Sequence, residues 1–320
     1  MSPARPVSSR TGRARLGLAG ALATAAIGAL WAVPALAQVG DGGATGLSVF
    51  AAVVLGLVEG LTEYLPVSST GHLLVANEVL GLGGTEAADT ALDAYAICIQ
   101  AGAILAVLVL YRSRIAQMVD GLLGRSAEGR TVLIAVVAAF VPTAIIGLAL
   151  RDVVRERLFG VGPIAAAWLI GGLAILVLVR TGALDRVGVE LHRITLLQAI
   201  VIGLGQAIAL WPGVSRSLVT IVVAVLAGLS LAAAVEFSFL LGLVTLTAAT
   251  ALTAMSDGEL LLDTFGLVTP VVGLVVAFAA AIVSVRWMVS WLQSRGLGAF
   301  GFYRIAIGVA AFAAIGTGSL

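Results

Sequence analysis

The sequence predicts an all-α protein that crosses a membrane several times, and three observations lead to that prediction. Of the 320 residues, 60% are hydrophobic and 11% are charged, with a mean hydropathy of +1.13. Soluble domains have roughly 25% charged residues. Long apolar segments recur along the chain, which is typical of membrane-spanning helices. Two pairs of these segments are broken by Pro, Gly and Ser, which predicts helical hairpins that enter the membrane and return.

Composition also excludes several classes of function. The net charge is +1, and no basic block with interleaved aromatic residues is present, so no nucleic-acid partner is expected. The single cysteine, Cys98, lies in an apolar run. It cannot form a disulfide within the chain, and a metal site built on thiolates is excluded. We interpret Cys98 as a small core residue.

The first 37 residues resemble a targeting segment. Residues 1–15 carry arginines and no acidic residue, and an uncharged run over 16–37 ends in Ala-Leu-Ala. This pattern predicts either a cleaved signal peptide or an N-terminal anchor. In both cases the chain after residue 37 emerges on the far side of the membrane. Residues 38–46 form a Gly-rich linker, and 47–320 are predicted to form one membrane-embedded domain.

Within that domain the expected helices follow from the apolar segments. These segments cover 47–64, 67–82, 92–111, 131–150, 162–179, 194–210, 214–229, 231–254, 265–286 and 300–318. The pairs 47–64/67–82 and 194–210/214–229 are too interrupted to cross about 30 Å of hydrocarbon. We predict that they form re-entrant hairpins packed inside the protein. About six full spans then remain.

The arginines of the connecting loops agree with this topology. The loops 112–130, 180–193 and 286–299 fall on one side, and the loops 151–161 and 255–264 on the other. The first side holds Arg112, Arg114, Arg125, Arg130, Arg180, Arg186, Arg193, Arg286 and Arg295. The second side holds Arg151, Arg155 and Arg157. Because positive residues concentrate in cytoplasmic loops, the first side is predicted to be the cytoplasmic one.

Three spans separate the two hairpins, so the hairpins should enter from opposite sides and meet near the midplane. An internal repeat supports this inverted arrangement. At a constant offset, Gly56-Leu57, Glu59, Leu61 and Ser68 correspond to Gly203-Leu204, Gln206, Ile208 and Ser215. A breaking proline, Pro66 or Pro212, stands near the same place in each half.

The first hairpin carries the densest polar motif in the chain, at residues 59–72. Glu59 and Glu63 are four residues apart, so a helix places both on one face. Two carboxylates at membrane depth are costly unless a cation, a metal or a proton lies between them. Small polar residues and an imidazole follow Pro66, namely Ser68, Ser69, Thr70 and His72. This motif predicts a functional site.

The second hairpin carries a cationic motif at residues 206–220. Arg216 follows the Pro-Gly break and is flanked by Ser215 and Ser217. A guanidinium offers a planar fork of donors that suits phosphate oxygens. Free backbone N–H groups at the start of the next helix also favour an anion. The two hairpin tips together could hold a divalent cation and a phosphate, which is the equipment of phosphoryl transfer.

Structural interpretations of the same residues stay open. Glu59 and Glu63 could simply pair with Arg216, and His72 could be a hydrogen-bonded core histidine. The hydroxyl residues could cap the following helices, and among those of the first motif only Ser69 is favoured as a chemical group. Gln100 and Glu236, isolated in apolar runs, are interpreted as partners in hydrogen bonds between helices.

The two motifs resemble those of a known family, the undecaprenyl-diphosphate phosphatases, also called bacitracin-resistance proteins. The stretch EGLTEYLPVSSTGH (Glu59–His72) is similar to the family's first signature, and ALWPGVSRS (Ala209–Ser217), followed by Thr220, to its second. Similar stretches also occur at 99–102, 141–143 and 236–241. The resemblance covers essentially all of 47–318.

The resemblance implies a multi-pass enzyme of the bacterial inner membrane with an active site facing the periplasm. Such an enzyme removes the terminal phosphate of undecaprenyl diphosphate and returns undecaprenyl phosphate to cell-wall synthesis. A divalent cation, Mg²⁺ or Ca²⁺, held by Glu59 and Glu63, and a homodimer are also implied. The implied catalytic positions are Glu59, Glu63, Ser69, His72 and Arg216. The implied substrate-binding positions are Ser68, Thr70, Ser215, Ser217 and Thr220.

Within this hypothesis, Ser69 is either a nucleophile activated by His72 or the group that positions a water, and His72 is the general base or acid. Glu59 and Glu63 hold the cation, or one of them acts as a base. One departure from the family is Leu218, which stands where a glycine is usual and could restrict the approach of a phosphate. The competing hypothesis is a secondary transporter or flippase of a prenyl phosphate or another anion, because inverted repeats with broken helices are common in transporters. The grouping of carboxylates, hydroxyls, imidazole and guanidinium favours the enzyme.

Overall fold

The structure is a computed structural model that describes residues 47–185 and 187–318. The predicted signal peptide or anchor and the linker, residues 1–46, lie outside the described residues. Within the described ranges the secondary structure is helical, apart from one isolated bridge between Val189 and Leu229. The prediction of an all-α membrane protein is therefore confirmed.

Among the described residues, six helices are long and apolar enough to cross a membrane. They are α4 (Glu86–Leu110), α6 (Ala127–Arg157), α7 (Val161–Arg180), α10 (Leu231–Phe265), α11 (Val268–Arg295) and α12 (Gly298–Thr317). Even the 20-residue helices α7 and α12 reach about 30 Å at 1.5 Å per residue. The predicted number of full spans is confirmed.

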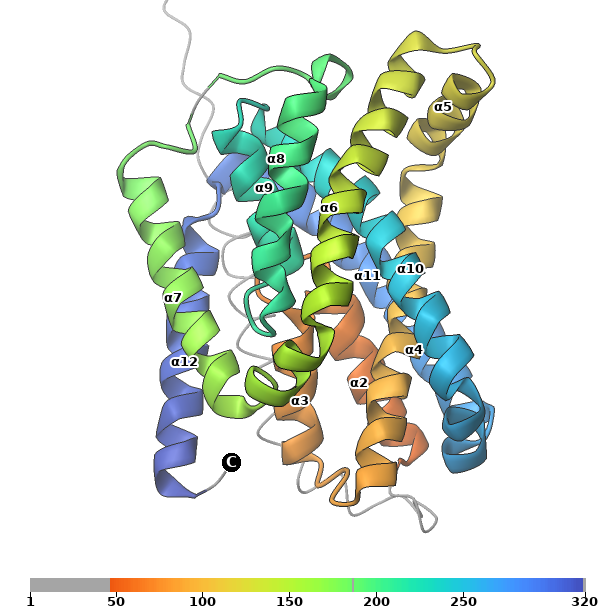
Figure 1. The fold of residues 1–320 in the computed structure, drawn as a ribbon. Coiled ribbons are helices and arrows are strands. Elements are labelled where there is room, and N and C mark those ends of the chain that lie inside the picture. Colours follow the sequence, from red (N-terminus) through yellow and green to blue (C-terminus); the bar gives the residue numbers. More distant parts are fainter. Residues whose placement is uncertain (1–46, 186, 319–320) are drawn as a thin grey trace, which may run out of the picture.

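The remaining apolar segments form two short hairpins. The first hairpin consists of α2 (Val49–Thr62) and α3 (Ser69–Val79), and the second of α8 (Leu196–Gln206), the 3₁₀ turn η3 (Ala207–Leu210) and α9 (Arg216–Leu226). Their α-helices have 11 to 14 residues, or about 17–21 Å, too little to span the hydrocarbon. The hairpins enter from opposite ends of the bundle (Figure 1). We call residues 63–68 the first tip and residues 207–215 the second tip.

The chain consists of two inverted halves that interlock. Each half is a hairpin followed by three long helices: α4, α6 and α7 in the first, and α10, α11 and α12 in the second. The first hairpin packs its α2 on α11, and the second packs its α8 on α6. Each hairpin is therefore held mainly by the other half, while α7 packs on α12 and α4 on α10 across the middle.

Glycines at equivalent positions make the two hairpin contacts possible. A Cβ at Gly56 would lie 2.5 Å from the carbonyl oxygen of Gly273 on α11. A Cβ at Gly203 would lie 2.7 Å from the carbonyl carbon of Ala139 on α6. Since backbone atoms cannot move aside cheaply, these two positions set the close approach of the hairpins to the long helices.

Several segments predicted as loops are helical. Most of the predicted loop 112–130 forms α5 (Arg112–Leu122) and the start of α6. Helix α5 turns back onto α6, with Met118 buried and Gly121 close to the backbone of Gly129. In the same way, α6 and α10 continue through the residues predicted as outer loops. Hydropathy marks only the part of a helix at membrane depth, so polar turns beyond it are missed.

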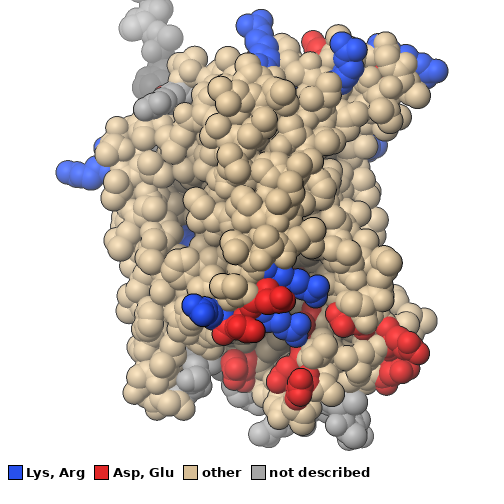
Figure 2. All heavy atoms as spheres, in the orientation of Figure 1, with Lys and Arg blue, Asp and Glu red and all other residues tan. Residues whose placement is uncertain are grey.

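The two ends of the bundle differ in charge. Basic side chains gather at the end that carries α5, and acidic side chains, together with a smaller basic group, near the opposite end (Figure 2). Helix α6 carries Arg151, Arg155 and Arg157 near its C-terminal end. This asymmetry is the one expected from the predicted topology, with the α5 end as the arginine-rich side.

The close contact of α8 with α6 is testable. We expect Gly203→Val to lower the free energy of unfolding by about 1–3 kcal/mol, because the added side chain must push α8 from the backbone of α6. The measurement is thermal unfolding in detergent. The matched control is Gly258→Val on α10, where an added Cβ meets nothing within 4 Å. Equal unfolding temperatures for the two variants would contradict a close approach of α8 to α6.

Candidate active site

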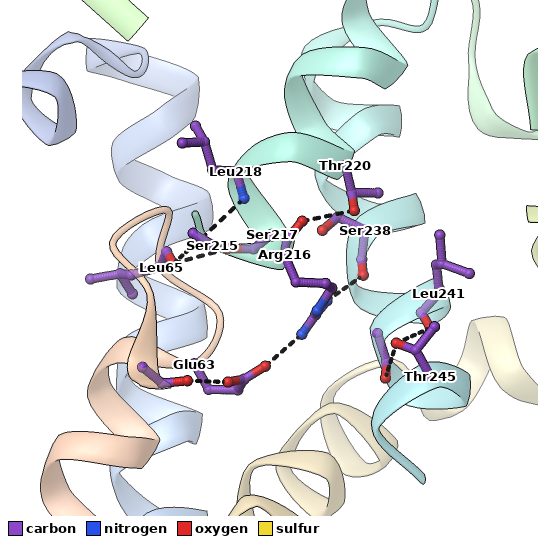
Figure 3. A network of polar contacts seen from close by, with 12 residues as sticks. Glu63, Leu65, Ser215, Arg216, Ser217, Leu218, Thr220, Ser238, Leu241 and Thr245 are labelled. Carbon is purple, nitrogen blue, oxygen red and sulfur yellow. Dashed lines mark hydrogen bonds and ion pairs between the residues drawn. The ribbon is translucent and has the colours of Figure 1, made fainter. Parts of the chain in front are cut away.

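The two tips meet inside the bundle, where Glu63 of the first tip pairs with Arg216, the residue that directly follows the second tip. The Nη2 of Arg216, at the start of α9, donates to the Oε1 of Glu63 in the first tip at 2.8 Å. The hydroxyl of Ser69, the first residue of α3, donates to the Oε2 of the same carboxylate. Figure 3 shows this chain of contacts running from one hairpin to the other. The structure therefore brings Glu63, Ser69 and Arg216 of the two predicted motifs into direct contact.

The guanidinium of Arg216 is held on more than one side. Its Nη1 donates to the carbonyl oxygen of Ser238 on α10 at 2.9 Å (Figure 3). The guanidinium carbon lies 5.4 Å from the centroid of the Tyr64 ring, a distance at which a cation is attracted by the ring. The Nε is buried and has no hydrogen-bond partner among the described residues. The guanidinium is thus fixed in place and still has one unused donor.

Gly242 leaves the space that Arg216 occupies. A Cβ at Gly242 would lie 2.5 Å from the guanidinium carbon of Arg216. Both Gly242 and Ser238 belong to α10, within the stretch 236–241 or next to it. Their roles could not be predicted from the sequence, because neither residue type stands out in an apolar helix.

Glu59 is the most buried acidic residue of the site, with 1% of its surface exposed. Its Oε1 has no hydrogen-bond partner among the described residues, and Glu63 and Arg216 are its charged neighbours. A buried carboxylate oxygen without a partner is costly. This oxygen is therefore available to accept a cation or a proton, and the cation expected between Glu59 and Glu63 stays a prediction.

A cavity of about 230 Å³ lies between the tips. Its polar lining comes from both hairpins and from α4, α6 and α10. The polar lining residues are Glu63, Ser68, Ser69, Thr70, Gln100, Thr143, Gln206, Ser215, Arg216 and Thr245. Gln100 on α4, interpreted as a partner in hydrogen bonds between helices, interacts with Glu59 on α2 and also lines this cavity. The volume accommodates a diphosphate group, and the lining is rich in donors.

Both tips contain a strained serine at equivalent positions. Ser68 has φ of 75° and Ser215 has φ of 73°, and among the described residues they are the only non-glycine residues with positive φ. Strain of this kind costs about 1–3 kcal/mol and concentrates at functional sites. Each serine precedes a helix start, and the helices α3 and α9 begin at the cavity. Their N-terminal dipole ends favour an anion there.

The capping interpretation holds for Ser215 and not for Ser68. The Oγ of Ser215 accepts a hydrogen bond from the backbone N–H of Leu218 at 3.3 Å. The side chain of Ser68 makes no capping bond. Ser69 uses its hydroxyl on Glu63, and Thr70 is exposed to the cavity.

Two predicted substrate-binding residues hold the fold together instead of lining the cavity. The hydroxyl of Ser217 donates to the carbonyl oxygen of Leu65 in the first tip at 2.9 Å. The hydroxyl of Thr220 contacts the carbonyl oxygen of Arg216 at 2.8 Å and the Oε1 of Gln206 at 2.9 Å. Both side chains are fully buried. Direct contact of Ser217 or Thr220 with a ligand stays a prediction.

His72 is engaged on the side away from the cavity. Its Nδ1 lies 2.7 Å from the carbonyl oxygen of Ser68, and its Nε2 lies 2.8 Å from the hydroxyl of Tyr303 on α12. The ring also stacks on Tyr303 and meets the edge of Trp168. This geometry matches the interpretation as a hydrogen-bonded core histidine. No hydrogen bond joins His72 to Ser69 among the described contacts, so its role as a base stays a prediction.

Leu218, where the resemblance leads one to expect glycine, points into the hydrophobic core. Its side chain is 5% exposed and packs in the largest apolar cluster. Figure 3 shows it on the side of α9 away from Glu63. The added Cβ therefore occupies core space and does not line the cavity.

One residue that reaches both tips was missed from the sequence. Arg304 on α12 is fully buried and donates to the backbone of both tips. A signal was present, because Arg304 is the only charged residue in the apolar segment 300–318. A charge at that depth is normally functional or paired.

Fold and site together define a polytopic membrane protein in which two inverted hairpins bring carboxylates, a hydroxyl and a guanidinium into one polar cavity. This is a membrane-embedded site for phosphate chemistry.

Comparison with known sequences agrees with this class: the chain belongs to the family described as bacitracin resistance protein BacA, which it matches over residues 52–310. It is 45% identical over 262 residues to an undecaprenyl-diphosphatase of Sorangium cellulosum, covering 81% of this chain and 84% of that protein. It is 40% identical to undecaprenyl-diphosphatase 2 of Rhodospirillum rubrum, covering 83% and 95%. For an undecaprenyl-diphosphatase of Herminiimonas arsenicoxydans the identity is 37%, covering 80% and 91%.

The positive φ of Ser68 and Ser215 leads to different predictions for their two glycine variants. We expect Ser68→Gly to raise the free energy of unfolding by up to about 1 kcal/mol, because glycine adopts positive φ without strain and no side-chain capping bond is lost. We expect Ser215→Gly to be neutral or destabilising, because it also removes the bond to the Leu218 amide and the contacts of this side chain with Leu65 and Ser217. Unfolding midpoints in detergent measure both. A larger gain for Ser215→Gly than for Ser68→Gly would contradict the stabilising role of the Ser215 hydroxyl.

Proposed function

We propose that the protein is an undecaprenyl-diphosphatase, which hydrolyses undecaprenyl diphosphate to undecaprenyl phosphate and inorganic phosphate and so recycles the lipid carrier of cell-wall synthesis. Family membership and the names of the relatives support this activity. The structural observation that carries it is the array of Ser69, Glu63 and Arg216 at the cavity. Transport of a prenyl phosphate is not favoured, because anion binding alone does not need a hydroxyl held on a carboxylate.

The cavity suits the diphosphate group. Arg216 supplies a fixed positive charge, and the starts of α3 and α9 supply backbone N–H groups and positive dipole ends. The hydroxyls of Ser68 and Thr70 and the amides of Gln100 and Gln206 line the same space. As charge shifts from the attacking to the leaving oxygen, these preorganised donors stabilise the transition state.

In the proposed reaction the hydroxyl of Ser69 attacks the terminal phosphorus, and its hydrogen bond to Glu63 supports this role. In this step a bond forms between the Ser69 Oγ and the phosphorus, and the hydroxyl proton passes to the Glu63 carboxylate that already accepts its hydrogen bond. The bond from this phosphorus to the bridging oxygen breaks, and undecaprenyl phosphate leaves. Water then attacks the phosphoserine, which releases inorganic phosphate and restores Ser69. Alternatively Ser69 holds the attacking water, and the two routes differ in whether a phosphoserine forms.

A divalent cation, Mg²⁺ or Ca²⁺, fits the oxygen-rich site. Glu59 has a buried oxygen without a partner among the described residues, and Glu63 and the cavity amides add oxygen ligands of the kind that hard cations prefer. Glu59 and Glu63 would hold the ion. Such an ion would neutralise part of the negative charge of the diphosphate.

The proposed setting is the bacterial inner membrane, with the active site open to the periplasm. The arginine-rich α5 end supports a cytoplasmic position for that end, which places the entry of the first hairpin on the opposite side. A homodimer, which the resemblance implies, stays a prediction.

The first test is phosphate release from a long-chain prenyl diphosphate by purified protein in detergent, with Mg²⁺, Ca²⁺ or a chelator. We expect cation-dependent release, and losses of at least about 100-fold in kcat for Glu63→Gln and Arg216→Ala, because each removes a preorganised charge. Ser69→Ala decides between the routes: abolished turnover supports Ser69 as nucleophile, and substantial remaining turnover supports water. Wild-type protein that binds the lipid and releases no phosphate would contradict the proposed function and favour transport.

A second test moves Arg216 without replacing it. We expect Gly242→Ala to lower kcat by about 10-fold or more, because its Cβ displaces the guanidinium from Glu63. The control is Gly258→Ala on the same helix, where the added Cβ meets nothing within 4 Å. The same kcat in both variants would show that the position of Arg216 is unimportant for turnover.

A further inference from the structure

Arg304 is a buried cation without an acidic partner. None of its surface is exposed, and no carboxylate lies within 4.0 Å among the described ion pairs. A guanidinium at membrane depth is costly unless its donors are satisfied. Its Nη1 and Nη2 donate only to backbone carbonyl oxygens, and its Nε has no partner within the described part of the chain.

The carbonyls that Arg304 contacts belong to both tips. Its Nη1 donates to Pro66 of the first tip at 3.3 Å, and its Nη2 donates to Gly213 of the second tip at 2.8 Å. A third acceptor is the carbonyl of Ala167 on α7 at 3.0 Å. Pro66 and Gly213 are equivalent in the internal repeat, since each stands two residues before a strained serine. One side chain therefore binds the same backbone position in both halves.

The reacting groups are divided between these two tips. Glu63 and Ser69 belong to the first hairpin, and Arg216 begins the second hairpin's α9. Besides the ion pair between Glu63 and Arg216, the described hydrogen bonds that join the two hairpins directly are those from Ser215 and Ser217 to Leu65. Arg304 adds a link from a third element, α12, because it binds one backbone carbonyl in each tip.

We propose that Arg304 is a positioning residue that fixes the separation and orientation of the two tips, and through them the geometry of Ser69, Glu63 and Arg216. The expected loss of turnover rests on the proposed function. The expected change in the position of the two tips rests on the structure alone. Arg304 does not line the cavity, so it acts through the tips and has no direct contact with substrate.

The space around Arg304 offers a second way to test its role. A Cβ at Gly171 on α7 would lie 3.0 Å from both the Cζ and the Nε of Arg304. Gly171→Ala therefore shifts the guanidinium while keeping its charge. Gly162 on the same helix meets nothing within 4 Å, so Gly162→Ala is the matched control.

The kinetic experiment compares Arg304→Met, Arg304→Lys, Gly171→Ala and Gly162→Ala as purified, folded protein. We expect Arg304→Met to lower kcat by about 100-fold with little change in KM, because misplacement by about 1 Å has that effect on turnover. Arg304→Lys should keep more activity than Arg304→Met, and guanidinium ion added to Arg304→Met should restore part of the lost activity. Gly171→Ala should lower kcat, and Gly162→Ala should match the wild type. Wild-type kcat for Arg304→Met, or a rise in KM alone, would overturn the proposal.

A geometric readout keeps the proposal testable if no phosphate is released. Spin labels on Leu61→Cys and Ile208→Cys, both exposed, in a Cys98→Ala background report the distance between the two hairpins near their tips. We expect Arg304→Met to broaden or shift this distance distribution, and Gly162→Ala to leave it unchanged. An unchanged distance distribution in Arg304→Met would overturn the positioning role of Arg304. If the wild type releases no phosphate and Arg304→Met still broadens the distribution, the positioning role is supported and the phosphatase function is rejected separately.

Discussion

The structure depends on one constraint: a chain that breaks its helices at membrane depth must satisfy the exposed backbone groups from within the protein. Each hairpin has such a break, and the partners come from far along the sequence. Trp168 on α7 donates to the carbonyl of Val67 at 3.0 Å, while Ser217 and Arg304 serve other carbonyls of the tips. The long helices α7 and α12, together with α9 of the second hairpin, therefore supply donors to the two breaks.

This constraint also explains where the charged groups lie. Carbonyls of the tips accept hydrogen bonds from Trp168, Ser217 and Arg304, and the N-terminal ends of α3 and α9 begin at the cavity. A cavity with positive helix ends and a guanidinium attracts anions, and Glu63 balances part of that charge. A buried ion pair is weak support for stability because its desolvation cost is large. Its value here lies in holding a hydroxyl and a guanidinium in register for chemistry.

The fold, and the approach of the two polar motifs to one another, could be predicted well from the sequence, and for physical reasons. Membrane-spanning segments have a strong hydropathy signal, and a pair of glutamates beside a proline break is costly unless it is used. The partners of the motif residues were less predictable. That Glu63 and not His72 contacts Ser69 depends on the turn of the first tip, and the link between Ser217 and Leu65 depends on how two distant hairpins dock. The lone charge of Arg304 in an apolar segment could have been recognised, but the carbonyls that it contacts could not.

The equivalence of the two tips has a consequence for the origin of such a site. Ser69 and Arg216 occupy the same position of the repeat, each directly after a strained serine, and Glu59 corresponds to Gln206. Two identical copies of one half would set like side chains face to face, either two hydroxyls or two mutually repelling guanidinium groups. Neither ancestor could unite a hydroxyl with a guanidinium at this position. Fusion of the halves into one gene would have allowed them to diverge, so that symmetry survives in the backbone while the chemistry is asymmetric.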